Sequence, residues 1–159
     1  MSAPVFADTF YYLALINPRD AAHSRALQST RRVSAKVVTS AWVIQELADG
    51  LAAPPARDSF LRFLSALEAD PNTRIVDPQA SLWRKGLALY RSRPDKDWPL
   101  TDCISFEIMR EQGITDALTV QMARHPEIAG WIWFNEAKER DWRVWSDERS
   151  LEAFRESLP

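Results

Sequence analysis

Three acidic residues stand at positions where an alternating pattern of strands and helices would bring them together. Asp8 ends the first apolar run. Glu46 lies in the helical stretch that follows the second apolar run, and Asp102 begins the helical stretch that precedes the last apolar run. In parallel sheets, ligands bind beyond the carboxyl ends of the strands, where strand order reverses. We therefore expect the three carboxylates to lie on one rim of the sheet.

Carboxylates that are brought together repel one another and raise each other's pKa unless a cation neutralises them. Oxygen ligands select hard ions such as Mg²⁺ or Mn²⁺, which often keep several waters and take only one or two carboxylates directly. Such an ion lowers the pKa of a bound water and stabilises charge on phosphate oxygens, and two ions can clamp the attacking and leaving oxygens. The chemistry that fits best is metal-assisted phosphodiester hydrolysis.

Each acid also has an ordinary structural explanation. Asp8 could simply cap a helix, since aspartate accepts backbone N–H groups there. Glu46 could be an exposed helical glutamate, and Asp102 could be stabilised by the positive end of its helix. Another possible chemistry is phosphoryl transfer with Asp8 as the nucleophile. It is less favoured because Thr9 and Phe10 follow Asp8 without a second acid.

Short β-branched runs alternate with amphipathic stretches along the chain. The runs predict strands over 4–8, 36–39, 74–76 and 114–120, and the amphipathic stretches predict helices over about 10–16, 18–30, 40–50, 55–69, 77–90 and 101–112. Ser40 and Thr101 are the expected helix caps, Pro18 an expected first-turn residue, and Gly113 a left-handed terminator. This alternation predicts an α/β fold with a parallel sheet and helices on both faces.

The composition predicts one domain over residues 1–159, of which 131–159 is atypical: it combines four tryptophans with a charge run and could hold an edge strand or hairpin and a terminal helix. No apolar run is long enough to span a bilayer and no secretion signal is evident, so we expect a cytoplasmic protein without membrane contact. The single cysteine, Cys103, excludes an intrachain disulfide and a zinc finger. Four unclustered glycines argue against a nucleotide cofactor, and a net charge of −2 requires any nucleic-acid affinity to come from a local patch.

Three segments resemble the PIN-domain nucleases, especially the VapC-type toxins of bacterial toxin–antitoxin pairs. They are VFADTFYYLALINPRDAAHSRAL, VVTSAWVIQELADGL and, most specifically, DKDWPLTDCISFEIMREQGITDALT, within residues 5–130. The resemblance implies a three-layer α/β/α sandwich with a parallel sheet of four to five strands and a Mg²⁺- or Mn²⁺-dependent endoribonuclease. It carries the family's metal ligands and catalytic acids onto Asp8, Glu46 and Asp102, and it implies an RNA substrate, a cognate antitoxin and a homodimer.

The chain departs from the family where another aspartate usually follows the fourth strand, because Gln121 occupies this region. A second metal should therefore bind more weakly or not at all, and a catalytically weakened or inactive protein that binds RNA or a protein partner is the alternative function. Asp116 begins the same strand and should point to the opposite end of the sheet. Asp97 could approach the rim, although a solvated loop acid is the simpler interpretation.

Several other polar residues are candidates for supporting roles. Thr9, Ser40 and Thr119 could hydrogen-bond the carboxylates or metal-bound waters, or simply cap helices. His23 is better explained by packing or surface exposure than by base catalysis, whereas His125 could contact phosphate. The best candidate RNA-binding group, against a default of solvated side chains, consists of Arg31, Arg32, Arg91, Arg93 and Lys96.

Overall fold

The computed structural model describes residues 3–117. The predictions that concern the end of the fourth strand, Thr119, Gln121, His125 and the segment 131–159 lie outside these residues. No helix within the described range is long and apolar enough to cross a membrane.

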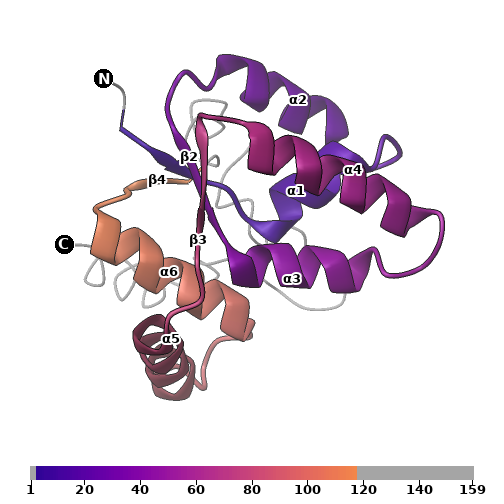
Figure 1. Ribbon diagram of the computed structural model, residues 1–159. Helices are drawn as coiled ribbons and strands as arrows, with labels where there is room; N and C mark the ends of the chain where they lie inside the picture. The colour runs from indigo at the N-terminus through magenta and orange to yellow at the C-terminus, as the bar shows by residue number, and fades with distance from the viewer. Residues whose placement is uncertain (1–2, 118–159) are drawn as a thin grey trace.

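Four short parallel strands form the central sheet (Figure 1). They are β1 (Val5–Phe6), β2 (Val37–Ser40), β3 (Thr73–Val76) and β4 (Asp116–Ala117), in the order β3-β2-β1-β4. The chain therefore adds strands in one direction from β1 to β3 and then returns to the other side of β1 for β4. This reversal makes the carboxyl ends of β1 and β4 the switch point of the sheet, where α/β proteins bind their ligands.

Six helices form two layers around the sheet (Figure 1). Four of them lie on one face: α1 (Thr9–Ile16), α2 (His23–Arg32), α3 (Ala41–Gly50) and α4 (Ala56–Ala69). The other two, α5 (Ala80–Ser92) and α6 (Leu100–Gln112), lie on the opposite face, because a right-handed crossover that returns to the other side of β1 must pass over that face. The predicted α/β/α sandwich with a parallel sheet is confirmed.

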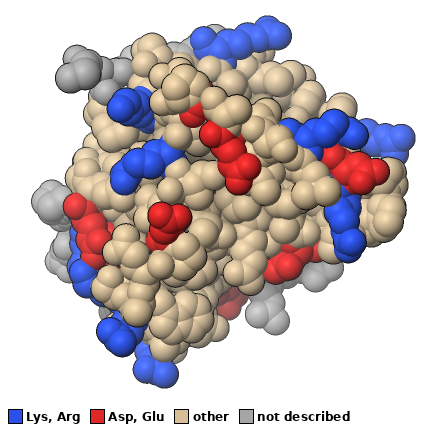
Figure 2. Space-filling model, viewed as in Figure 1, with Lys and Arg blue, Asp and Glu red and all other residues tan. Residues whose placement is uncertain are grey.

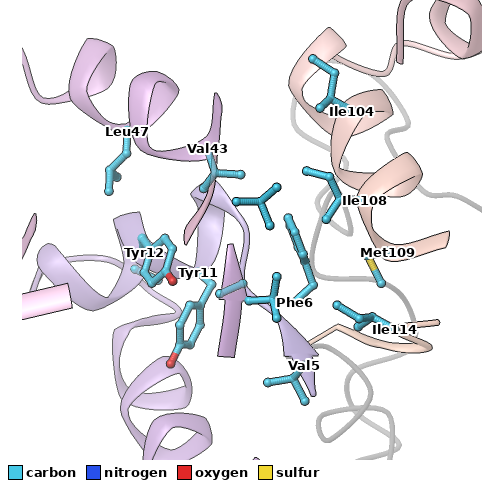
Figure 3. Packing of buried hydrophobic residues seen from close by; sticks show 14 of the residues in the cluster. Val5, Phe6, Tyr11, Tyr12, Val43, Leu47, Ile104, Ile108, Met109 and Ile114 are labelled. Carbon is cyan, nitrogen blue, oxygen red and sulfur yellow. The ribbon is translucent and has the colours of Figure 1, made fainter. Parts of the chain in front are cut away.

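The core fills the space on both sides of β1 (Figure 3). Val5 and Phe6 are almost fully buried at the centre of the sheet. On one side they face side chains of α1 and α3, including Tyr12 and Leu47, and on the other they face α6, including Ile108. The residue that follows this strand is therefore held between two packed layers, which fixes its position.

The sequence predicted some helix ends correctly. The Ser40 hydroxyl accepts the amide of Val43 at 3.3 Å and caps α3, as expected. Gly113 ends α6 with φ 60°, a left-handed conformation that glycine adopts without steric cost.

Other helix starts were predicted wrongly. The helix expected from Pro18 begins only at His23, because Asn17 and Asp20 accept backbone amides two residues ahead of them and hold the intervening chain in turns. Thr101 does not cap α6 either. Its cap is Pro99, whose carbonyl accepts the amides of Asp102 and Cys103.

Candidate metal centre

Asp8 is fixed at the switch point by contacts on either side of it. Its Oδ1 accepts the amide of Tyr11 at 2.8 Å, so the predicted role of Asp8 as a helix cap is real. The hydroxyl of Thr39 donates to the carbonyl of Ala7 at 2.8 Å and ties the end of β2 to the chain just before Asp8. The side chain is nevertheless only 8% exposed, which an ordinary helix cap does not require.

Burial raises the pKa of Asp8 from 3.8 to about 6. The amide of Tyr11 opposes this increase, whereas the negative charge of Glu46 adds to it. A carboxylate with a raised pKa at a ligand-binding edge is a typical mark of a functional site.

Glu46 lies on α3, half-buried, and faces the start of α1. Its Oε2 accepts the hydroxyl of Thr9 at 2.5 Å. Because Thr9 directly follows Asp8, this bond holds the Glu46 carboxylate close to the end of β1. Thr9 therefore orients an acid, one of the supporting roles that the sequence left open for it.

Asp102 lies in the first turn of α6 and is 7% exposed. Its Oδ2 is buried and has no hydrogen-bond partner among the described residues. Burial raises the pKa of Asp102 well above its ordinary value, and the charges of Asp8 and Glu46 raise it further. A buried carboxylate oxygen without a partner costs free energy, so a group outside residues 3–117, such as a hydrogen-bond donor or a cation, is expected to satisfy it.

The three predicted acids thus come from the N-cap of α1, from α3 and from α6, and they influence one another electrostatically. No basic side chain neutralises Asp8 or Asp102 in the interactions of residues 3–117. The atoms that could bind a ligand here are carboxylate oxygens, and one of them, Asp102 Oδ2, is buried without a partner among the described residues. Such oxygens fit a hard divalent cation such as Mg²⁺ or Mn²⁺.

Within residues 3–117, no three His, Cys, Asp or Glu side chains are arranged so that all could ligate one ion directly. This arrangement is compatible with Mg²⁺, which commonly binds through one or two carboxylates and keeps several waters. Direct ligation by all three acids therefore stays a prediction.

The five basic residues proposed from sequence as an RNA-binding group do not form one patch. Arg31 is on α2 and Arg91 on α5, in opposite layers, and the side chain of Arg32 is outside the description (Figure 1). Figure 2 shows lysines and arginines scattered among acids on the visible face. Arg93 and Lys96 do lie near each other, in the connection between α5 and α6, where both are largely covered.

The remaining candidates lie where the simpler interpretations put them. The Nδ1 of His23 donates to the carbonyl of Ala14 at 2.7 Å and packs α2 against α1, so His23 is a structural residue. Asp116 pairs with Val5 at the start of β4, at the opposite end of β1 from Asp8. Asp97 is exposed in the α5–α6 connection.

The sequence did not single out Asp95, Trp98 and Phe106, which organise the chain just before and after Asp102. The available signal was the Arg-x-Asp spacing of Arg93 and Asp95, two residues that can form a local ion pair. Nothing in the spacing of Trp98 and Phe106 distinguishes them from ordinary core aromatics.

The fold is similar to that in the crystal structure of VapC20 from Mycobacterium tuberculosis, which is described as a toxin that cleaves the sarcin–ricin loop. The two share a TM-score of 0.66 and 24% sequence identity over 71% of this chain and 86% of that one. At this identity the likeness establishes a shared fold. No protein-family model and no curated protein sequence matches the chain.

Proposed function

We propose that this chain is a Mg²⁺- or Mn²⁺-dependent endoribonuclease and the toxin of a toxin–antitoxin pair, with Asp8, Glu46 and Asp102 as its metal-binding acids. The observation that carries the proposal is the buried Asp102 carboxylate: one of its oxygens has no partner among residues 3–117, and it is subject to the charges of the other two acids. Its location at the switch point of a fold shared with an RNA-cleaving toxin supports this function.

The residues of the site have distinct tasks. The amide of Tyr11 fixes one oxygen of Asp8, and the hydroxyl of Thr9 fixes one oxygen of Glu46. Asp102 offers, from the opposite layer, a buried oxygen that has no partner in the described part of the chain. When bound, the cation would supply a water of lowered pKa and positive charge for the phosphate oxygens. The burial of two of the acids excludes bulk water and strengthens their attraction for a cation.

The proposal can be tested by RNA cleavage with isosteric variants. Purified protein is incubated with RNA and Mn²⁺ or Mg²⁺, and a sarcin–ricin loop RNA is a suitable first substrate because VapC20 is described as cleaving it. Asp8→Asn, Glu46→Gln and Asp102→Asn should each lower the cleavage rate by at least about a hundredfold, within the range known for metal-ligand and catalytic residues. Asn also caps helices well, so Asp8→Asn preserves the start of α1. Cleavage undiminished by Asp8→Asn would refute the assignment.

The partners follow from the same proposal. A cognate antitoxin would be a small protein that blocks access to the acids, and a homodimer is the expected assembly of the toxin. Light scattering of the purified chain tests the dimer, and co-purification with the product of an adjacent small gene tests the antitoxin.

A second candidate is a catalytically weakened protein that binds RNA or a partner through the same edge. It is favoured by the lack of a directly ligating acid triad within residues 3–117 and by Gln121, which lies outside them. Retained RNA binding, with no cleavage in either metal, would support this function over the first.

A further inference from the structure

The connection between α5 and α6 contains a set of contacting side chains that we call the latch: Arg93, Asp95, Trp98 and Phe106. Arg93 donates from Nε and Nη2 to the two carboxylate oxygens of Asp95, each at 2.9 Å. The guanidinium carbon lies 5.1 Å from the centroid of the Trp98 ring. Trp98 in turn packs edge-to-face on Phe106, with ring centroids 5.1 Å apart. The latch therefore joins the connecting loop to the body of α6.

The latch is adjacent to Asp102 in the helix. Phe106 lies four residues after Asp102, so the two are neighbours on the same side of α6. The carbonyl of Pro99, next to Trp98, accepts the amides of Asp102 and Cys103. Trp98 is thus connected to α6 both before Asp102, through Pro99, and after it, through Phe106. Moving Trp98 would therefore displace the first turn of α6.

The first turn of α6 depends on contacts from outside the helix more than the first turns of α1 and α3 do. Asp8 caps α1 and Ser40 caps α3 through side-chain hydrogen bonds, but α6 has no side-chain cap. Asp102 Oδ2 also makes no hydrogen bond to the described residues. Neither the helix cap nor this oxygen of Asp102 therefore fixes its carboxylate, so the first turn of α6 depends on contacts such as those of the latch.

We propose that the latch is a positioning device that holds the first turn of α6, and with it the Asp102 carboxylate, where a divalent cation can be bound. The inference rests on the proposed metal-dependent function and assigns positioning roles to Arg93, Asp95 and Trp98. The competing role for Arg93, direct contact with RNA phosphate, fits less well. Two of its nitrogens donate to Asp95, its guanidinium carbon lies over the Trp98 ring, and its side chain is 21% exposed.

The test measures Mn²⁺ affinity of the full-length chain by titration calorimetry, with no RNA present. Arg93→Lys keeps the charge but loses the two-pronged contact and the guanidinium over the Trp98 ring, and Asp95→Asn loses the charge that holds Arg93. Each should weaken Mn²⁺ binding by about tenfold, the size expected when a residue that orients a ligand is removed. The double variant should be little worse than either single one, because both remove the same contact.

Trp98→Phe and Trp98→Ala test the aromatic part of the latch. Phenylalanine keeps an aromatic ring against Phe106 and should restore most of the affinity that alanine loses. Lys85→Gln is the matched control: it breaks the ion pair of Lys85 with Glu111, which also joins α5 to α6 but lies nine residues beyond Asp102. This variant should bind Mn²⁺ with the affinity of the unsubstituted protein.

The possible outcomes separate the inference from the function on which it rests. If the unsubstituted chain binds no Mn²⁺, both are overturned. If it binds Mn²⁺ and Arg93→Lys and Asp95→Asn bind it equally well, only the latch is overturned. Unchanged Mn²⁺ affinity in Arg93→Lys, together with a raised KM and a smaller salt dependence for RNA in Arg93→Gln, would make Arg93 an RNA contact instead. Should Trp98→Ala fail to fold, the Arg93 and Asp95 variants still decide the question.

Discussion

The hydroxyl of Thr9 donates a 2.5 Å hydrogen bond to Oε2 of Glu46, which joins the first residue of α1 to the middle of α3 across 37 positions of sequence. The bond aims a half-buried carboxylate at the end of β1, where Asp8 lies. A hydroxyl that donates to a carboxylate fixes the direction of the accepting oxygen. Glu46 thus owes its direction to a residue next to another acid of the site.

Thr9→Val should therefore weaken the site without disturbing the fold. Valine has the same shape as threonine but cannot donate, so the Glu46 carboxylate loses its fixed direction. We expect Mn²⁺ affinity to fall by roughly tenfold, while the melting temperature changes by only a few degrees. Thr9→Ser restores the donor and should restore the affinity. Equal affinity in Thr9→Val and the unsubstituted chain would mean that this bond has no part in metal binding.

The raised pKa of Asp8 predicts a pH dependence of stability in the metal-free protein. In the folded chain the pKa of Asp8 is about 6, whereas that of an ordinary aspartate is 3.8, so folding favours the protonated form. The stability that Asp8 contributes is therefore fully present below pH 4 and is lost as the pH rises through 6, by up to roughly 3 kcal/mol. Urea unfolding at pH 4.5, 6 and 7.5 should show that the free energy of unfolding of Asp8→Asn increases relative to that of the unsubstituted protein as the pH rises. A constant difference between the two would contradict the raised pKa.

Asp102→Asn should stabilise the metal-free protein at pH 7.5 and abolish its response to Mn²⁺. Asparagine removes a buried charge that faces Asp8 and Glu46, so we expect a gain of about 1–3 kcal/mol in the free energy of unfolding. The unsubstituted protein should instead melt several degrees higher when millimolar Mn²⁺ is added, because a ligand that binds only the folded state stabilises it.

The matched control for this variant is Asp58→Asn. Asp58 also occupies the first turn of a helix, α4, but it is exposed. Its neutralisation removes only a favourable helix-dipole interaction and should cost about 0.3–1 kcal/mol. If both variants shift stability in the same direction, Asp102 is an ordinary first-turn acid and the metal assignment loses its main support.

Much of the fold could be predicted from local sequence signals. Ser40 and Gly113 mark helix ends through their own chemistry, and short apolar runs give the strands. The start of α2 was predicted wrongly because Asn17 and Pro18 also fit turns, and only the tertiary structure decides between a turn and a helix. Thr101 failed as a cap for a similar reason, since the backbone carbonyl of Pro99 does that work instead.

The candidate site was partly predictable because parallel strands place their carboxyl ends on one edge. This rule puts Asp8 at the switch point without knowledge of any distance. The latch was not predictable, because it depends on a ring contact between a loop residue, Trp98, and Phe106 in the next helix. Contacts of this kind are set by packing and leave no periodic trace in the sequence.

The packing of α5 against α6 gives a final prediction, because it determines where Asp102 can lie. Gly86 of α5 is buried against Ile104, and a Cβ at this position would lie 2.4 Å from Cγ1 and 3.0 Å from the backbone Cα of Ile104. Gly86→Ala must therefore push α6 outward, two residues after Asp102, and should cost about 1–3 kcal/mol of stability together with Mn²⁺ affinity. Gly50→Ala is the control: among residues 3–117 its Cβ would meet only Leu13, at 4.0 Å, so it should be neutral or stabilising by up to about 1 kcal/mol. Urea unfolding of the two variants decides, and equal stability would show that the α5–α6 contact yields more easily than its geometry indicates.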